Sequence, residues 1–171
     1  MEPWEIHPSL VHFPIALLIA GLCTDLYARA RGSLSAGHVA TGLYVAGVVA
    51  GLVTGLAGVL AFYTVPSAHT EQAHDQVLWH LGLALAAVVL FAVVAWVRWR
   101  GWGELPSVGA LVVSVVAVGL LTAAGYLGGH IVYHGAMGVE PDLLSPRLAK
   151  HHHGGGADET QHVSGGDHHG H

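Results

Sequence analysis

Histidines at the ends of long apolar stretches carry most of the chemistry that this sequence offers. Two of them stand in the segment His-Pro-Ser-Leu-Val-His-Phe-Pro, one opens a later apolar stretch, and two lie four residues apart near the end of the last one. Residues four apart share one face of a helix, and imidazole is the commonest metal-ligating side chain. The pattern therefore predicts a site for haem iron or for a transition metal. The candidate ligands for that cofactor are His7, His12, His80, His130 and His134.

Haem b is the cofactor that fits this pattern best. Haem iron takes one axial histidine, or two from facing helices, and its macrocycle needs an apolar slot. Bundles of helices provide such sites between facing helices. His12 and His80 are expected near the first turns of two helices, with His130 and His134 at the end of a third, where several glycines would admit the edge of a porphyrin. No Cys-x-x-Cys-His occurs in the sequence, which excludes covalent c-type attachment.

A bare divalent transition metal is the alternative, because mixed histidine and carboxylate ligation suits zinc, iron, copper and nickel. Possible ligands stand before the third apolar stretch and in the C-terminal tail, residues 140–171, whose His-rich composition is typical of metal-binding segments. The tail cannot bury enough apolar surface to fold and is predicted to be disordered. In a third interpretation the histidines only set the polarity of a membrane interface. The metal candidates are Glu71, His74, Asp75, His151, His152, His153, His168, His169 and His171.

The apolar stretches between these histidines predict membrane-spanning helices. The chain is 53% hydrophobic and only 10% charged, whereas ordinary soluble domains carry about 25% charged residues. A span needs about 20 predominantly apolar residues, and four stretches approach or exceed that length. The sequence predicts an all-α, integral membrane four-helix bundle over residues 1–139. Its expected spans are at about 9–28, 39–62, 76–96 and 107–131.

Two features of the first two spans bear on how the bundle packs. In the second span, Gly47, Gly51 and Gly55 repeat at every fourth position. Small residues at that spacing let two membrane helices approach closely, and the alternative is room for a flat cofactor. In the first span, Asp25 stands near the far end, and we expect it at the interface, close to the arginines that follow it.

The charged residues predict the orientation of the bundle. Four spans place both termini on one side of the membrane, and most histidines before the tail fall on that side. The connections within the two halves of the chain hold Arg29, Arg31, Arg98 and Arg100, whereas the middle connection has no Lys or Arg. By the positive-inside rule the arginine connections are cytoplasmic, so both termini and the histidine site are extracytoplasmic. The formal net charge of −5 argues against a nucleic-acid partner.

The opening motif resembles that of a bacterial membrane family, the domain of unknown function 2231. The segment 7–14, the histidine at position 80 and the ending Gly-Gly-x-x-Val-Tyr-x-Gly at 128–135 are similar to motifs of that family. The resemblance covers about residues 6–139 and implies a four-span bundle in the bacterial cytoplasmic membrane, with its motifs gathered at one face. Some relatives carry fused c-type cytochrome or iron–sulfur domains, which implies an electron-transfer partner of that kind.

These observations together predict a haem b or metal-binding membrane protein with its site near the outer face. It would pass electrons between a membrane carrier and an external redox partner. A metal-binding or transport-accessory protein that uses the tail is the alternative, and a structural membrane subunit without a cofactor is another. No nucleophile constellation or phosphate-binding loop is present in the sequence, so hydrolase and kinase chemistry have no support.

Overall fold

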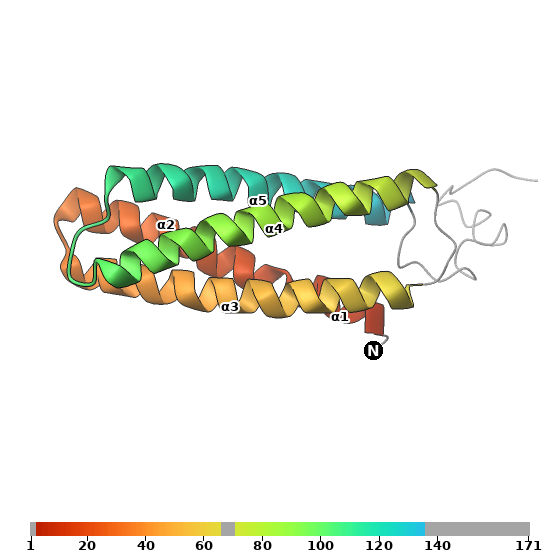
Figure 1. The fold of residues 1–171 in the computed structure, drawn as a ribbon, viewed down its shortest axis with the longest axis horizontal. Helices are drawn as coiled ribbons and strands as arrows, with labels where there is room; N and C mark the ends of the chain where they lie inside the picture. Colours follow the sequence, from red (N-terminus) through yellow and green to blue (C-terminus); the bar gives the residue numbers. More distant parts are fainter. Residues whose placement is uncertain (1–2, 66–70, 136–171) are drawn as a thin grey trace, which may run out of the picture.

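The computed structural model describes residues 3–65 and 71–135, and within them it contains helices and no strand. This confirms the predicted all-α bundle. A short 3-10 turn, η1, precedes the first helix, and a break at Val11 separates α1 from α2 (Figure 1). The elements are η1 (Pro3–Glu5), α1 (Ile6–Leu10), α2 (His12–Arg31), α3 (Leu34–Thr64), α4 (Glu71–Arg100) and α5 (Val108–Gly135).

Four helical segments are long and apolar enough to cross a membrane, which confirms the four predicted spans. They have 26 to 31 residues each, so at 1.5 Å per residue they are about 39–47 Å long. A hydrocarbon core is only about 30 Å thick, and the helices therefore continue into the polar interface at both ends. For that reason the observed helices extend beyond the predicted spans. Their bounds are Ile6–Arg31, Leu34–Thr64, Asp75–Arg100 and Val108–His134.

The bundle consists of two helical hairpins, α2 with α3 and α4 with α5. Gly32 ends α2 in the left-handed conformation (φ 64°), and Ser33 caps α3 by accepting a hydrogen bond from the Ala36 amide. The partners within each hairpin contact one another far more extensively than α3 contacts α4. One end of the bundle, here called the histidine end, holds α1, the end of α3, the start of α4 and the end of α5 (Figure 1). The opposite end, with the two hairpin connections, is the arginine end.

Packing of the bundle depends on a buried core and, within the first hairpin, on Gly47. Leu18, Tyr44, Phe91 and Ala117 are fully buried near the middle of the bundle. A Cβ atom on Gly47 would lie 2.6 Å from Leu18, which leaves no room for any other residue at that position. The interpretation of this glycine as a packing residue is therefore confirmed.

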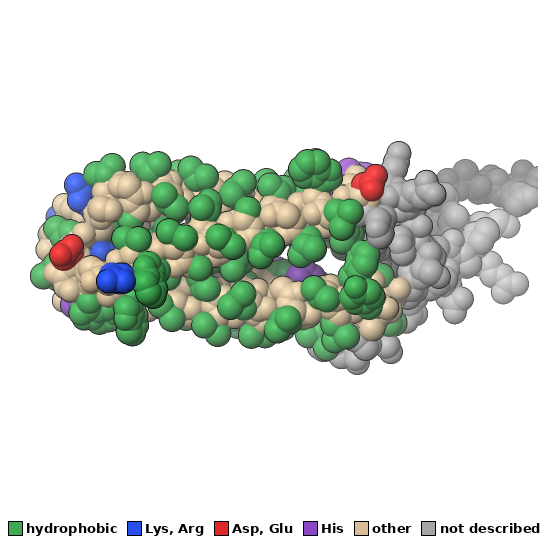
Figure 2. All heavy atoms as spheres, in the orientation of Figure 1, with side chains coloured by type: hydrophobic (Ala, Val, Ile, Leu, Met, Phe, Trp, Pro, Cys, Tyr) green, Lys and Arg blue, Asp and Glu red, His purple; other side chains and the backbone are tan. Residues whose placement is uncertain are grey.

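The outer surface of the bundle is apolar along its length (Figure 2). Large hydrophobic side chains on every long helix are more than 45% exposed, among them Leu26, Leu56, Leu85 and Val112. Continuous exposed apolar surface of this size marks a membrane or protein interaction site. The arrangement is that of a membrane protein in contact with lipid.

The expectation that Asp25 lies close to the arginines that follow it, Arg29 and Arg31, is corrected by its pairing inside the bundle. Its carboxylate is fully buried, and its partner is Arg98 of α4, at 3.3 Å. Leu18, Leu22 and Asp25 recur at helical spacing on the inner face of α2, which carries the acid into the bundle. The Arg98 guanidinium also donates to the carbonyl oxygens of Gly37 and Glu104, so it ties α2, α3 and the α4–α5 connection together.

Candidate functional site: two histidine pairs at one end of the bundle

The imidazole rings of His7 and His80 lie together at the histidine end of the bundle. Their centroids are 6.2 Å apart, and the ring planes are nearly perpendicular, at 87°. His7 comes from α1 and His80 from α4, so the pair joins the first half of the chain to the second. Both side chains are partly buried.

Each of the two rings is held by the backbone of a neighbouring helix. His7 Nδ1 lies 2.9 Å from the carbonyl oxygen of Thr54 in α3, and His80 Nδ1 lies 2.8 Å from that of Ala124 in α5. A carbonyl oxygen only accepts hydrogen bonds, so in both rings Nδ1–H is the donor. A neutral imidazole in this tautomer keeps a free lone pair on Nε2. Metal-ligating histidines are oriented by the same kind of bond from their second nitrogen.

Glycines allow the two rings to lie this close to the helices. A Cβ atom on Gly58 would lie 3.0 Å from the His7 ring, and one on Gly128 would lie 3.1 Å from the His80 ring. Each glycine follows the carbonyl-bearing residue, Thr54 or Ala124, by four positions. Each hairpin thus holds one histidine in the same way: a backbone carbonyl accepts the hydrogen bond from the ring, and a glycine one helical turn later leaves space for the ring.

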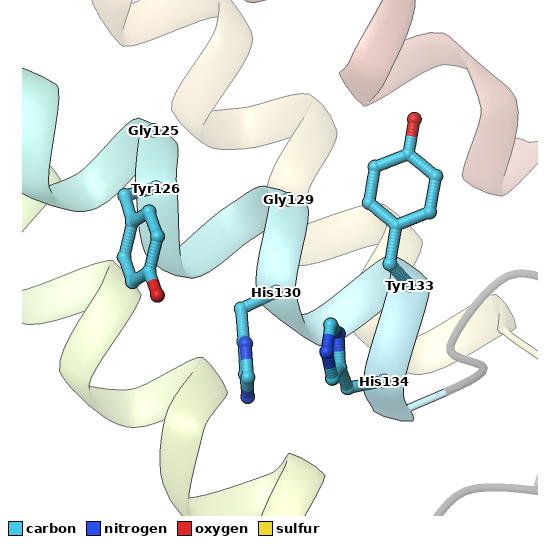
Figure 3. A pocket seen from close by; sticks show the side chains of 6 residues that line it. All are labelled: Gly125, Tyr126, Gly129, His130, Tyr133 and His134. Atoms are coloured by element: carbon cyan, nitrogen blue, oxygen red, sulfur yellow. The ribbon is translucent and has the colours of Figure 1, made fainter.

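His130 and His134 form a second pair on α5. Their rings are stacked, with centroids 4.2 Å apart and planes inclined by 16°, and Tyr126 lies one turn before them at 6.3 Å from His130. Figure 3 shows the two imidazoles side by side on one side of α5, whereas Tyr133 points away from them. A hollow of about 380 Å³ adjoins the pair. It is lined by Gly125, Tyr126, Gly129, His130, Tyr133 and His134.

The second pair faces away from the first. Gly128 contacts the His80 ring, and His130 follows it by two residues, which is about 200° around a helix. The five histidines predicted to share one cofactor therefore fall into two pairs and a fifth residue. That fifth residue, His12, is exposed on α2, and it is His7 from the same opening motif that lies beside His80.

The other predicted metal ligands are only partly placed. Asp75 is exposed on the first turns of α4. Glu71 and His74 belong to the same helix, but their side chains lie outside the described part, as do all the tail histidines from His151 on. Among the side chains that the structure describes, no three of His, Cys, Asp or Glu are grouped for a metal ion. His38 lies at the arginine end, stacked on Trp102 at 4.6 Å.

Sequence reasoning missed the residues that position the first pair. Thr54 and Ala124 act through backbone carbonyls, which no side-chain motif reveals. Gly58 follows the glycine repeat of the second span and Gly128 stands in the ending motif, and neither position reveals which side chain it contacts. The signal that the sequence does contain is a histidine near the start of the first apolar stretch of each hairpin and a glycine near the end of the second.

Comparisons with known proteins identify the chain at the level of a family. A family described as "Predicted membrane protein (DUF2231)" matches residues 3–141, which is most of the chain. No curated protein and no solved structure matches. The matched region contains both histidine pairs and all four spans.

Proposed function

We propose, on the premise that this chain belongs to the DUF2231 family of predicted membrane proteins, that it binds haem b iron between His7 and His80. It would pass electrons between a carrier in the membrane and a redox partner, such as a c-type cytochrome or an iron–sulfur protein, at the outer surface. The observation that carries the proposal is the pair of backbone-held imidazoles, 6.2 Å apart, that come from different hairpins.

The separation of the rings would allow His7 and His80 to hold one iron between them. A metal–nitrogen bond is about 2.0–2.1 Å long, and the ring centre lies roughly 1 Å beyond the nitrogen, so opposed imidazoles have centroids about 6 Å apart. The observed 6.2 Å agrees with this value. The Nδ1–Cε1 edge of each ring lies against α3 or α5, so the Nε2 edge is turned away from that helix and toward a ligand.

The number of donors supports haem over a bare ion at this position. A structural zinc site takes four protein ligands and a catalytic one takes three, and no such group is present among the described side chains. Haem iron receives four nitrogens from the macrocycle and needs only one or two from the protein. Two neutral imidazoles are therefore a sufficient set for haem and an incomplete one for zinc.

Access to the site supports a ligand that approaches from the apolar surroundings. Figure 2 shows an opening between the surfaces of α3 and α4, with a histidine side chain visible inside it. A Cβ atom added to Gly55 on α3 would meet no other atom within 4 Å. Atoms added to Gly51 and Gly58, on either side of it, would meet Val88 and His7. The looser contact between the hairpins thus leaves room on the side where the first pair lies.

The residues of the chain have defined roles in this proposal. Haem would supply the one-electron chemistry. The Thr54 and Ala124 carbonyls fix the ring orientations and raise the basicity of Nε2, as partners of ligating histidines do. The buried side chains of Leu18 and Phe91 lie between the histidine pair and the arginine end and would exclude water from the site. The low dielectric of that core would favour an iron centre of low net charge.

The experiment that tests the proposal is an absorption spectrum of the full chain purified in detergent after expression with haem available. We expect bound haem with two histidine ligands, and loss or a clear shift of its bands in His7→Ala and His80→Ala. His12→Ala is the matched control, because His12 is exposed in the same motif, and it should keep the parent spectrum. Absence of haem from the parent protein, or equal spectra in all three variants, would overturn the proposal.

A further inference from the structure

We propose that His130 and His134 form a second metal site, which takes one divalent transition cation of the imidazole-preferring class, with Cu²⁺ as the probe. The site stands on the described geometry of α5 and does not depend on haem binding at the first pair. It assigns a separate role to two histidines that the first pair leaves unused.

The centroid separation of the pair matches that of two ligands in adjacent coordination positions, although the stacked planes, inclined by 16°, must turn before both nitrogens point at one ion. Two imidazoles bound at about 90° to one ion, with metal–nitrogen bonds near 2.0 Å, have ring centroids roughly 4–4.5 Å apart. The centroids of His130 and His134 are 4.2 Å apart, whereas those of the first pair are 6.2 Å apart. The two rings of the second pair lie side by side on one side of α5 (Figure 3), so a single ion can approach both.

The immediate surroundings leave the two rings available. His134 is exposed and His130 partly so, and the hollow of about 380 Å³ beside them can hold an ion with its water ligands. Stacking with one another and with Tyr126 is the contact that the described residues give these rings. Both rings can therefore turn out of their stack to bring the two nitrogens to one ion, at the cost of the stacking contact and of no hydrogen bond that the described residues give them.

The donor set indicates which cation the site takes. Two neutral imidazoles with the remaining positions open to water suit tetragonal Cu²⁺ or Ni²⁺, while calcium and magnesium prefer oxygen ligands. Copper stands above the other first-row divalent ions in affinity for such a site. An open, two-ligand site exchanges its ion readily, which suits capture of a cation at the membrane surface.

The test is Cu²⁺ titration of the full-length chain, followed by calorimetry and electron paramagnetic resonance. Copper binding by the tail must first be removed by replacing each of its histidines with asparagine, which leaves the length of the tail unchanged. These residues are His151, His152, His153, His162, His168, His169 and His171.

We expect one Cu²⁺ per chain with coupling to two imidazole nitrogens. His130→Asn and His134→Asn should each weaken binding by about tenfold or more, since losing even an outer-shell partner of a metal ligand costs that much. Each should also reduce the signal to one nitrogen. His12→Asn, another exposed histidine, is the control and should leave both readouts unchanged. Equal Cu²⁺ affinity in all three variants would refute the second site.

The haem spectrum separates this proposal from the first one. Neither His130→Asn nor His134→Asn should alter it, because their side of α5 is turned away from His80. A haem band that shifts in both variants would overturn the assignment of a separate site. Absence of haem from every variant would refute the haem proposal alone and leave the copper result to stand by itself.

Discussion

Removing the guanidinium of Arg98 should destabilise the bundle more than any exposed substitution on α4. In Arg98→Met the Asp25 carboxylate stays fully buried and loses its partner at 3.3 Å. Breaking a buried ion pair by removing one member costs about 3–5 kcal/mol, because the remaining charge is uncompensated. The carbonyl oxygens of Gly37 and Glu104 also lose their donors. A loss in the upper part of that range is therefore expected.

Arg100→Met is the matched control for this prediction. Arg100 stands two residues further along the same helix, is exposed, and contacts the Trp96 ring at 5.3 Å. An exposed cation–π contact is worth about 0.5–1 kcal/mol, so the control should unfold close to the parent protein. The free energy of unfolding can be measured by titration with a denaturing detergent and followed by circular dichroism.

A double variant separates the ion pair from simple loss of packing. In Asp25→Asn/Arg98→Met both charges are removed, so no charge stays buried without a partner. Replacing a buried ion pair by neutral groups is often close to neutral in stability, and the double variant should be more stable than Arg98→Met alone. If Arg98→Met and Arg100→Met unfold within about 0.5 kcal/mol of one another, as ordinary surface changes do, the assigned role of the pair is wrong.

Two further predictions concern the glycines and the tail. Gly58→Leu and Gly128→Leu should each reduce the haem bound per chain, because a Cβ atom at these positions already lies 3.0 or 3.1 Å from a histidine ring. Gly42→Leu is the control, because Gly42 faces open space on α3 toward the arginine end, and it should bind haem as the parent does. A pyridine haemochrome assay gives the stoichiometry. Removing residues 151–171 should leave the helical circular dichroism signal unchanged, since almost no apolar side chain is lost, and should lower the number of weakly bound divalent ions measured by elemental analysis.

The spans and the gathering of histidines could be predicted from the sequence because both follow from composition along a single helix. Which histidine of the opening motif faces the bundle is a matter of helical rotation. His7 and His12 are five residues apart, about 140° around a helix, so both cannot point inward. Which of the two faces the interior depends on the position of the buried stripe around the helix. The sequence does not show that α1 and α2 are separate helices with an interruption at Val11, so it does not fix that position.

The partners across the bundle could not be predicted, because they depend on the register between helices. Asp25 lies on the same stripe as Leu18, so its burial was readable from spacing. Its pairing with Arg98 requires a particular axial register of α4 relative to α2. Hydropathy locates the ends of a span only to within about one helical turn, so it does not determine that register. The same limit applies to the bonds from His7 to Thr54 and from His80 to Ala124.

The orientation prediction gains a sharper form from the buried ion pair. Arg98 is neutralised by Asp25 inside the bundle, so the predicted cytoplasmic location of the arginine end depends on the charges of Arg29, Arg31 and Arg100. All three are exposed, and acidic residues contribute little to this bias. A reporter fused after the last residue should therefore behave as extracytoplasmic, and one inserted at Ser33 should behave as cytoplasmic. Replacing two of the exposed arginines by glutamine should reduce the difference between the two reporters. The opposite pattern would place the first histidine pair on the cytoplasmic side and exclude an external redox partner.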